Sequence, residues 1–208
     1  MKKITAQITA LFFAFSASVS ADSLQDLQGL LTSIKSFQAD FSQRTLDANG
    51  SVKQIIKGEM QVEKPGFLRW ETEGEYAQLV VSDGNSIWIY DQDLESVSIK
   101  PMSKEMSETP ALLLSGDADS IARDFNVSAG DVVNDKQQFV LKPKDSSQLF
   151  DQLNLAFEKG VLIQMTINDA SGLTTDIQFS DAKNNPELDK HLFTFIVPEG
   201  VDVIDSRR

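Results

Sequence analysis

Residues 56–73 read IKGEMQVEKPGFLRWETE, two alternating runs that are separated by a Pro-Gly break. Met60 and Val62 alternate with polar side chains in the first run, and Leu68 and Trp70 lie on one face of the second. A period of two places the apolar side chains of a strand on one face, and Pro-Gly is typical of a turn. The segment therefore predicts two neighbouring β-strands, each with an apolar face.

Similar short runs follow along the chain and are separated by turn residues such as Asp83-Gly84-Asn85. Short alternating runs with turns between them are typical of an antiparallel meander. We expect further strands over residues 76–82, 86–90, 94–101, 131–134, 138–143, 152–158, 161–168, 174–182 and 193–195. A sheet of about ten strands tends to curl, so its concave face encloses a cavity or a packed core.

Two segments break this period. From Asp22 to about Leu46, apolar residues recur every three or four positions, which predicts a long N-terminal helix with one apolar stripe. Residues 105–125 predict a helical insert that starts at residues 107–110, with a second short turn over 119–124. Ile121 and Phe125 are expected to face inwards there. The predicted fold class is therefore α+β, a curved antiparallel sheet with helices on its concave side.

The N-terminus is typical of an export signal. Lys2 and Lys3 precede a mostly apolar run of about 12 residues, and small residues follow, with Val19 and Ala21 before the expected cut. The run is shorter than the roughly 20 residues that a membrane-spanning helix needs. A buried first helix would not explain this order of charges, apolar run and small residues. We expect residues 1–21 to be a signal peptide and residues 22–208 to be a single domain.

The chain contains no cysteine, so neither a disulfide nor the acylated cysteine of a bacterial lipoprotein is expected. Its net charge of −12 is unfavourable for binding nucleic acid or anionic lipid surfaces, which attract basic patches. These features predict a soluble, unanchored protein outside the cytoplasm.

The sequence offers no recognisable motif for catalysis, cofactors or metals. The single histidine, His191, lies in a charged segment and is expected to be a solvated surface residue. The usual zinc and thiol sites need more histidine or cysteine than the chain has. Asp91, Asp93 and Glu95 lack the rest of a calcium loop and are expected to be turn residues. Paired carboxylates for glycoside hydrolysis stay open, without specific support.

Several segments, in order along the chain, resemble the family of periplasmic outer-membrane lipoprotein carriers, LolA. They are FQADFSQ (37–43), KPGFLRW (64–70), LVVSDGNSIWIYD (79–91), TPALLL (109–114), FTF (193–195) and PEGVDVI (198–204). Each is weak alone, but together they span nearly the whole expected domain. The resemblance implies an incomplete antiparallel β-barrel whose apolar concave face is covered by a helical lid. It implies no enzyme activity and no cofactor.

The resemblance also implies partners. A monomeric periplasmic shuttle of this family accepts acylated lipoproteins from an inner-membrane ABC-type releasing complex and delivers them to an outer-membrane receptor. Burying an acyl chain is worth about 0.8 kcal/mol for each CH₂ group, so a triacylated protein does not leave a membrane for water unaided. The carrier must therefore offer an apolar site and still release its cargo.

The resemblance and the alternation together assign roles to particular residues. The expected acyl-chain cavity is lined by Met60, Val62, Leu68, Trp70, Val80, Ile87 and Ile89. The expected lid residues are Leu112, Leu113 and Phe37. Many family members have an arginine before the strand-breaking proline, thought to bond to lid backbone and hold the closed form. Lys64 occupies this position and offers a point charge in place of a planar fork, so we expect a less firmly latched lid.

Three alternative functions differ from this one in what they require of the chain. The membrane-anchored receptor of the same fold would need a cysteine at the start of the exported domain, where the chain has Asp22. A carrier for another amphiphile, such as a glycolipid, is compatible with the sequence. An acidic hydrolase would need converging carboxylates with raised pKa values.

Overall fold

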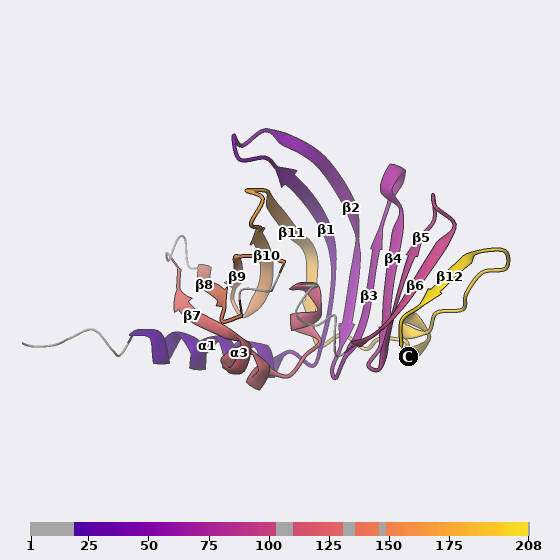
Figure 1. Cartoon of the computed structure of the whole chain (residues 1–208). Helices are drawn as coiled ribbons and strands as arrows, with labels where there is room; N and C mark the ends of the chain where they lie inside the picture. The colour runs from indigo at the N-terminus through magenta and orange to yellow at the C-terminus, as the bar shows by residue number, and fades with distance from the viewer. Residues whose placement is uncertain (1–18, 103–109, 131–135, 146–148, 208) are drawn as a thin grey trace, which may run out of the picture.

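Twelve strands form one open, curved sheet in the computed structural model, which describes residues 19–102, 110–130, 136–145 and 149–207 (Figure 1). The strand order is β12-β6-β5-β4-β3-β2-β1-β11-β10-β9-β8-β7. Two antiparallel meanders, β1–β6 and β7–β11, are joined where β1 pairs with β11. Only the short C-terminal strand β12 runs parallel to its neighbour, β6, among the described strands. The predicted class, an incomplete barrel with helices, is confirmed.

The strands have the following bounds: β1 Ser36–Leu46, β2 Val52–Glu63, β3 Phe67–Thr72, β4 Gln78–Asp83, β5 Ser86–Asp91, β6 Ser96–Pro101, β7 Phe125–Ala129, β8 Lys136–Pro143, β9 Gln152–Glu158, β10 Val161–Asn168, β11 Thr174–Asn184 and β12 Asp202–Asp205. The helices are α1 Val19–Ser33 and α3 Ala118–Asp124, with 3₁₀ turns η1 Gly74–Tyr76, η2 Pro110–Leu114 and η3 Lys190–Phe193.

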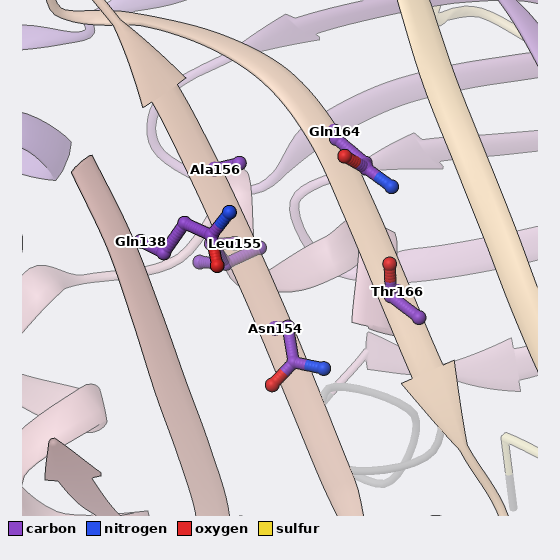
Figure 2. Close-up of a pocket in the computed structure, with 6 residues that line it drawn as sticks. All are labelled: Gln138, Asn154, Leu155, Ala156, Gln164 and Thr166. Atoms are coloured by element: carbon purple, nitrogen blue, oxygen red, sulfur yellow. The ribbon is translucent and has the colours of Figure 1, made fainter. Parts of the chain in front are cut away.

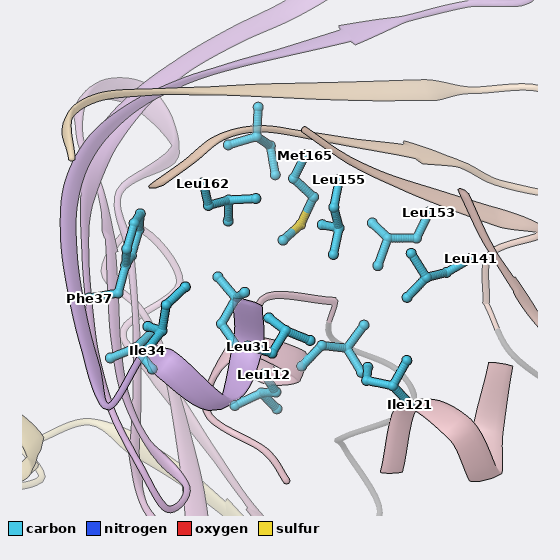
Figure 3. Close-up of a cluster of buried hydrophobic side chains, with 14 of the residues drawn as sticks. Leu31, Ile34, Phe37, Leu112, Ile121, Leu141, Leu153, Leu155, Leu162 and Met165 are labelled. Carbon is cyan, nitrogen blue, oxygen red and sulfur yellow. The ribbon is translucent and has the colours of Figure 1, made fainter. Parts of the chain in front are cut away.

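Three of these helical segments, α1, η2 and α3, cover the concave face of the sheet, and together we call them the lid. They contribute Leu27, Leu31, Leu112 and Ile121 to one cluster of buried apolar side chains, which the inner faces of the strands complete. Figure 3 shows Leu31, Leu112 and Ile121 of the lid on the side of the cluster that faces Leu153, Leu155, Leu162 and Met165 of β9 and β10. Each such side chain contributes roughly 1.5–3 kcal/mol to folding when it is fully buried. The lid and the sheet therefore form a single core.

The long N-terminal helix is predicted wrongly beyond Ser33. Helix α1 ends there, and residues 36–46 form strand β1 at the centre of the sheet. The side chain of Asn185 fixes the junction, because its Oδ1 accepts from the backbone N–H of Lys35 at 2.7 Å and its Nδ2 donates to the Ser33 carbonyl at 3.0 Å. Every second side chain of this part of β1 points to the inner face of the sheet: Phe37, Ala39 and Phe41. Phe37 is therefore a sheet residue, and its assignment to a helical lid is wrong.

The C-terminal segment is also corrected. Residues 193–195 were expected to form a strand, but Phe193 ends the 3₁₀ turn η3, whose Asp189 cap accepts from the His191 N–H at 2.9 Å. This segment crosses the outer face of the first meander, where Phe193 lies 5.5 Å from the ring of Phe67. Strand β12 follows it and was not predicted. His191 itself is exposed, as expected.

The helical insert is partly confirmed. Helix α3 forms where a short helical turn was expected over 119–124, and both Ile121 and Phe125 are buried as expected. Phe125 also begins β7, a strand that the sequence did not indicate. The expected helix start at residues 107–109 and the expected strand at 131–134 lie outside the described residues, as does most of the expected signal peptide.

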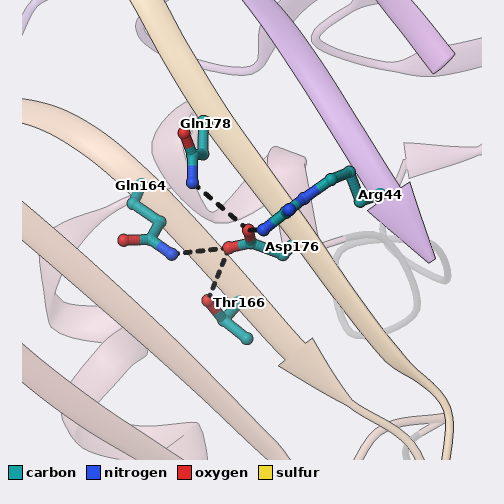
Figure 4. A network of polar contacts seen from close by, with 5 residues as sticks. All are labelled: Arg44, Gln164, Thr166, Asp176 and Gln178. Atoms are coloured by element: carbon teal, nitrogen blue, oxygen red, sulfur yellow. Dashed lines mark hydrogen bonds and ion pairs between the residues drawn. The ribbon is translucent and has the colours of Figure 1, made fainter. Parts of the chain in front are cut away.

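A buried carboxylate ties three strands together on the outer face of the sheet. Asp176 on β11 accepts from Arg44 at 3.0 Å, from Gln164 at 2.5 Å and from Thr166 at 3.2 Å (Figure 4). Burial alone would raise the pKa of Asp176, but these donors hold the pKa below its ordinary value of 3.8. Because the folded pKa is lowered, the carboxylate stabilises the fold above pH 3.8 and ceases to do so as the pH falls below that value.

Replacing Asp176 by asparagine is expected to lower the free energy of unfolding at pH 7 by about 1–3 kcal/mol, because hydrogen bonds to a charged group are lost. The gap between the two proteins should shrink as the pH falls below the ordinary aspartate value. Urea denaturation at several pH values from 7 to about 2.5 measures this difference in the free energy of unfolding. Asp151→Asn, at an exposed position, is the control. A gap that does not depend on pH would contradict the assigned role.

Candidate functional site

The strand register places all seven expected cavity residues on one face of the sheet. Met60 pairs with Trp70, Val62 with Leu68, and Trp70 in turn with Val80. Val80 pairs with Ile89, and Ile87 lies two positions before Ile89 on the same strand. Since residues that pair directly across an antiparallel ladder point to the same side, these side chains form one continuous apolar surface.

The burial of side chains decreases along this inner face. Met60, Val62, Leu68 and Ile87 are almost fully buried and belong to the core cluster. Trp70, Val80 and Ile89 are only partly buried and pack against that cluster. The face therefore continues from the core beneath the lid to apolar side chains that solvent partly reaches.

Trp70 is held by an aromatic partner that the sequence did not assign to the site. The ring of Phe41 on β1 stacks on Trp70 with 4.0 Å between centroids and an interplanar angle of 27°. Gly58 on β2 makes this stacking possible, because it pairs with Phe41 and has no side chain under the ring. The alternation of Phe37, Ala39 and Phe41 was the available signal, and the helical interpretation of this segment concealed it.

The expected lid residues of the insert lie on η2, and their function in a lid stays a prediction. Leu112 and Leu113 on η2 are buried in the same cluster as the inner face of the sheet. Leu27 and Leu31 on α1 join them, so the lid covers the inner face from two separate parts of the chain. The closed arrangement is therefore maintained by apolar contacts between lid and sheet.

Lys64 links this lid to the sheet. It follows the last residue of β2, and its Nζ donates to the backbone carbonyl of Leu31, in the last turn of α1, at 2.7 Å. The negative end of the helix dipole favours a cation at this place. Burial lowers the pKa of Lys64, while the negative charge of Asp117 opposes this shift. The structure thus brings Lys64 into contact with lid backbone, and its role as a latch stays a prediction.

The outer face of the second meander differs in chemistry. A groove of about 130 Å³ crosses β8, β9 and β10 there and is lined mainly by polar side chains: Gln138, Asn154, Gln164 and Thr166, with Leu155 and Ala156 (Figure 2). Amide and hydroxyl groups lose hydrogen bonds to water when an apolar ligand covers them. The groove is therefore unsuited to an acyl chain, and we place the apolar site on the inner face.

In the part of the chain that the structure describes, no helix has the length and apolar character needed to cross a membrane.

Comparisons with known proteins agree with this geometry. Residues 32–196 match the family described as outer membrane lipoprotein carrier protein LolA. The chain is 42% identical over 203 residues to an outer-membrane lipoprotein carrier protein of Azotobacter vinelandii, with 96% of each chain covered. It is also 42% identical over 204 residues to the protein of that name from Pseudomonas paraeruginosa, again with 96% of each covered.

Among solved structures, a LolA-superfamily protein of Nitrosomonas europaea shares the fold, with a TM-score of 0.50 and 14% identity over 86% of this chain and 99% of the other. The family match covers most of the chain, and the relatives are matched over nearly their whole length. The chain therefore belongs to the outer membrane lipoprotein carrier family, LolA.

Proposed function

We propose that this protein carries lipoproteins through the periplasm, with their acyl chains bound on the inner face of the sheet. The observation that carries the proposal is the register of β2 to β5, which aligns seven apolar side chains on one inner face that begins in the core beneath the lid. Residues 1–21 act as the export signal in this account, and the domain from Asp22 onwards acts between the two membranes.

The exchange between lid and cargo keeps the binding free energy small. Bound acyl chains would take the place of lid side chains such as Leu31 and Leu112, which are already buried against the sheet. The cargo gains about 0.8 kcal/mol for each CH₂ group that it buries, and displacing the lid offsets part of this gain. Such an exchange gives a grip that is strong enough to keep a triacylated protein in solution and weak enough to release it.

In the proposed cycle, the cargo comes from an inner-membrane ABC-type releasing complex and goes to an outer-membrane receptor. The names of the relatives describe outer-membrane lipoprotein carriers, which supports lipoproteins as the cargo. The donor and the acceptor rest on the family resemblance.

A release assay tests the proposal. Proteoliposomes that contain the releasing complex and a lipoprotein are incubated with ATP and the domain spanning residues 22–208, and the supernatant is analysed. We expect a soluble complex of one carrier and one lipoprotein. Retention of all lipoprotein in the membrane fraction would refute the proposal. Recovery of a different lipid or glycolipid in the supernatant would show that this lipid, and not a lipoprotein, is the cargo.

Lys64→Arg is expected to hold the lid closed more firmly, since a guanidinium offers more donors to the carbonyls at the end of α1. A gain of about 1 kcal/mol would lower the open fraction roughly fivefold. Hydrogen exchange of the α1 amides measures opening, and the matched control is Lys57→Arg, at an exposed position of β2. Unchanged exchange and unchanged cargo release in Lys64→Arg would show that this residue is not a latch.

A further inference from the structure

The apolar inner face of the first meander continues onto the last strand of the chain. Strand β12 pairs with β6, and its register places Ile204 opposite Ser98. Ser98 pairs with Ile89 on β5, and Ile89 pairs with Val80 on β4. Since residues paired directly across a ladder point to the same side of the sheet, Ile204 lies on the inner face. We call Trp70, Val80, Ile89, Ser98 and Ile204 the open row.

Burial decreases along this row towards the edge of the sheet. Met60, which pairs with Trp70 at the inner end of the row, is 0% exposed, whereas Ile204 is 62% exposed. The lid lies at the opposite edge, because α1 packs against β7 and α3, and β7 and β12 are the two edge strands. Figure 1 shows β12 at the end of the sheet that is far from α1 and α3. The open row therefore leads out of the core and away from the lid.

The outer face of the same strands is covered by the chain itself. The C-terminal segment crosses it, with the ring of Phe193 at 5.5 Å from that of Phe67 and the ring of Phe195 at 5.8 Å from that of Tyr90. The chain then turns at the edge and adds Ile204 to the inner face. One apolar face thus has a cover from the protein, while the other extends by a further strand whose apolar residue is exposed to solvent.

The exposed isoleucine is unusual for its position. Edge strands usually carry charged side chains, as β12 does at Asp202 and Asp205. Ile204 lies between these two residues and continues an apolar row, which is typical of a surface that a ligand covers. From β2 to β12 the row crosses five inter-strand intervals, about 24 Å at a spacing of about 4.8 Å. This distance is comparable with the length of an extended palmitoyl chain.

We propose that the β12 edge is the exit of the acyl site. The methyl ends of the acyl chains lie beneath the lid, the methylene groups next to the ester lie on Ile204, and the polypeptide of the cargo leaves over β12. The inference rests on the proposed function and adds the orientation of the cargo to it. The reverse orientation would bury polar ester groups beside Leu112 and Ile121, where they would lose hydrogen bonds to water.

Single-cysteine variants test the exit, because the chain contains no other cysteine. Ile204→Cys and Val203→Cys place thiols on opposite faces of the same exposed strand, and Val80→Cys reports on the inner face nearer the core. A water-soluble maleimide alkylates each variant with and without a triacylated lipopeptide. At a lipopeptide concentration of about four times Kd, alkylation of a covered thiol should slow about fivefold. We expect this protection in Ile204→Cys and Val80→Cys, and none in Val203→Cys or with the peptide lacking acyl chains.

The possible results separate the exit from the carrier function. Protection of Val80→Cys without protection of Ile204→Cys would overturn the exit and leave the inner-face site intact. Equal protection of Val203→Cys and Ile204→Cys would also overturn it, since the cargo would then cover both faces of the edge. A bound lipopeptide that protects neither Val80→Cys nor Ile204→Cys would refute the inner-face site of the proposed function as well.

The orientation is tested with lipopeptides whose acyl chains carry a nitroxide either next to the ester or at the methyl end. A nitroxide broadens the NMR signals of nearby methyl groups. The label next to the ester should broaden the signals of Ile204, and the label at the methyl end should broaden those of Val62, which is buried on the inner face of β2. The reverse pattern, or equal broadening of both residues by both labels, would overturn the proposed orientation.

Discussion

Replacing Val80 by glutamate is expected to reduce soluble lipoprotein release at least about tenfold, whereas the same replacement at Val140 leaves release unchanged. Val80 lies on the inner face, through its pairing with Trp70 and Ile89. Val140 lies on the outer face, because its neighbours Phe139 and Leu141 point into the core. Both valines are partly buried, so the two variants make the same chemical change on opposite faces of one sheet.

The physical reason is the cost of covering a carboxylate with hydrocarbon. In the closed, empty form the partly exposed side chain at position 80 keeps contact with water, and the fold should persist. A bound acyl chain would remove that water, and an unpaired ionised group then costs more than the ~1.4 kcal/mol that corresponds to a tenfold loss of affinity. Circular dichroism and thermal melting check the fold of both variants. Equal release by the two, or a loss in Val140→Glu only, would place the cargo elsewhere.

Gly58→Ala is expected to destabilise the protein by about 3 kcal/mol or more. A Cβ at this position would lie 2.0 Å from the Glu71 carbonyl oxygen and 2.6 Å from the ring of Phe41. Relief of these contacts requires movement of the β2–β3 ladder and of the Phe41–Trp70 stack, and overpacking of a core typically costs about 1–3 kcal/mol even without a backbone clash. Urea denaturation gives the value, and hydrophobic-dye binding reports whether the Trp70 region has opened.

Gly29→Ala is the matched control. Gly29 lies on the exposed side of α1, and a Cβ added to it would meet no atom within 4 Å. Alanine there should stabilise the protein by about 0.5–1 kcal/mol, since it favours the helix over the unfolded chain. A Gly58→Ala protein that is as stable as the parent would show that β2 and β3 are not held as close as described.

The meander could be predicted because its signals are local. The alternation of Met60 with Val62 and of Leu68 with Trp70, on either side of Pro65-Gly66, fixes both the strands and the face that each residue occupies. The same logic placed Val80, Ile87 and Ile89 correctly with them. Predicting the face of these residues requires only the two-residue alternation and the short turns, and both can be read from a single sequence.

The errors arise where distant partners decide the local structure. Leu31, Ile34, Phe37 and Phe41 fit a helical spacing, and the small Ala39 hides the alternation that β1 follows. The change from helix to strand is fixed by Asn185, which lies 150 residues from Lys35 along the chain. Strand β12 forms by pairing with the edge of β6. Its own residues, Asp202–Asp205, are all exposed and show no apolar pattern typical of a buried strand.

The candidate site also divides into residues that the sequence predicts and contacts that it does not. Its apolar residues could be predicted from the sequence. The partner of Lys64 could not, because it is a backbone carbonyl of α1, and every residue type has such a carbonyl. The stacking of Phe41 on Trp70 was missed together with β1, since only the strand register brings the two rings to one face.

The two tryptophans test the central claim most directly, because they lie on opposite faces of the sheet. Trp70 is on the inner face, and Trp88 pairs with Val81 and Ile99 on the outer face. The single-tryptophan variants Trp88→Phe and Trp70→Phe can each be titrated with a lipopeptide whose acyl chains carry bromine, a short-range quencher of tryptophan fluorescence. If acyl chains bind the inner face, the emission of Trp70 is quenched in a saturable manner and that of Trp88 is not. Quenching of Trp88 alone, or of both residues to the same extent, would contradict the account.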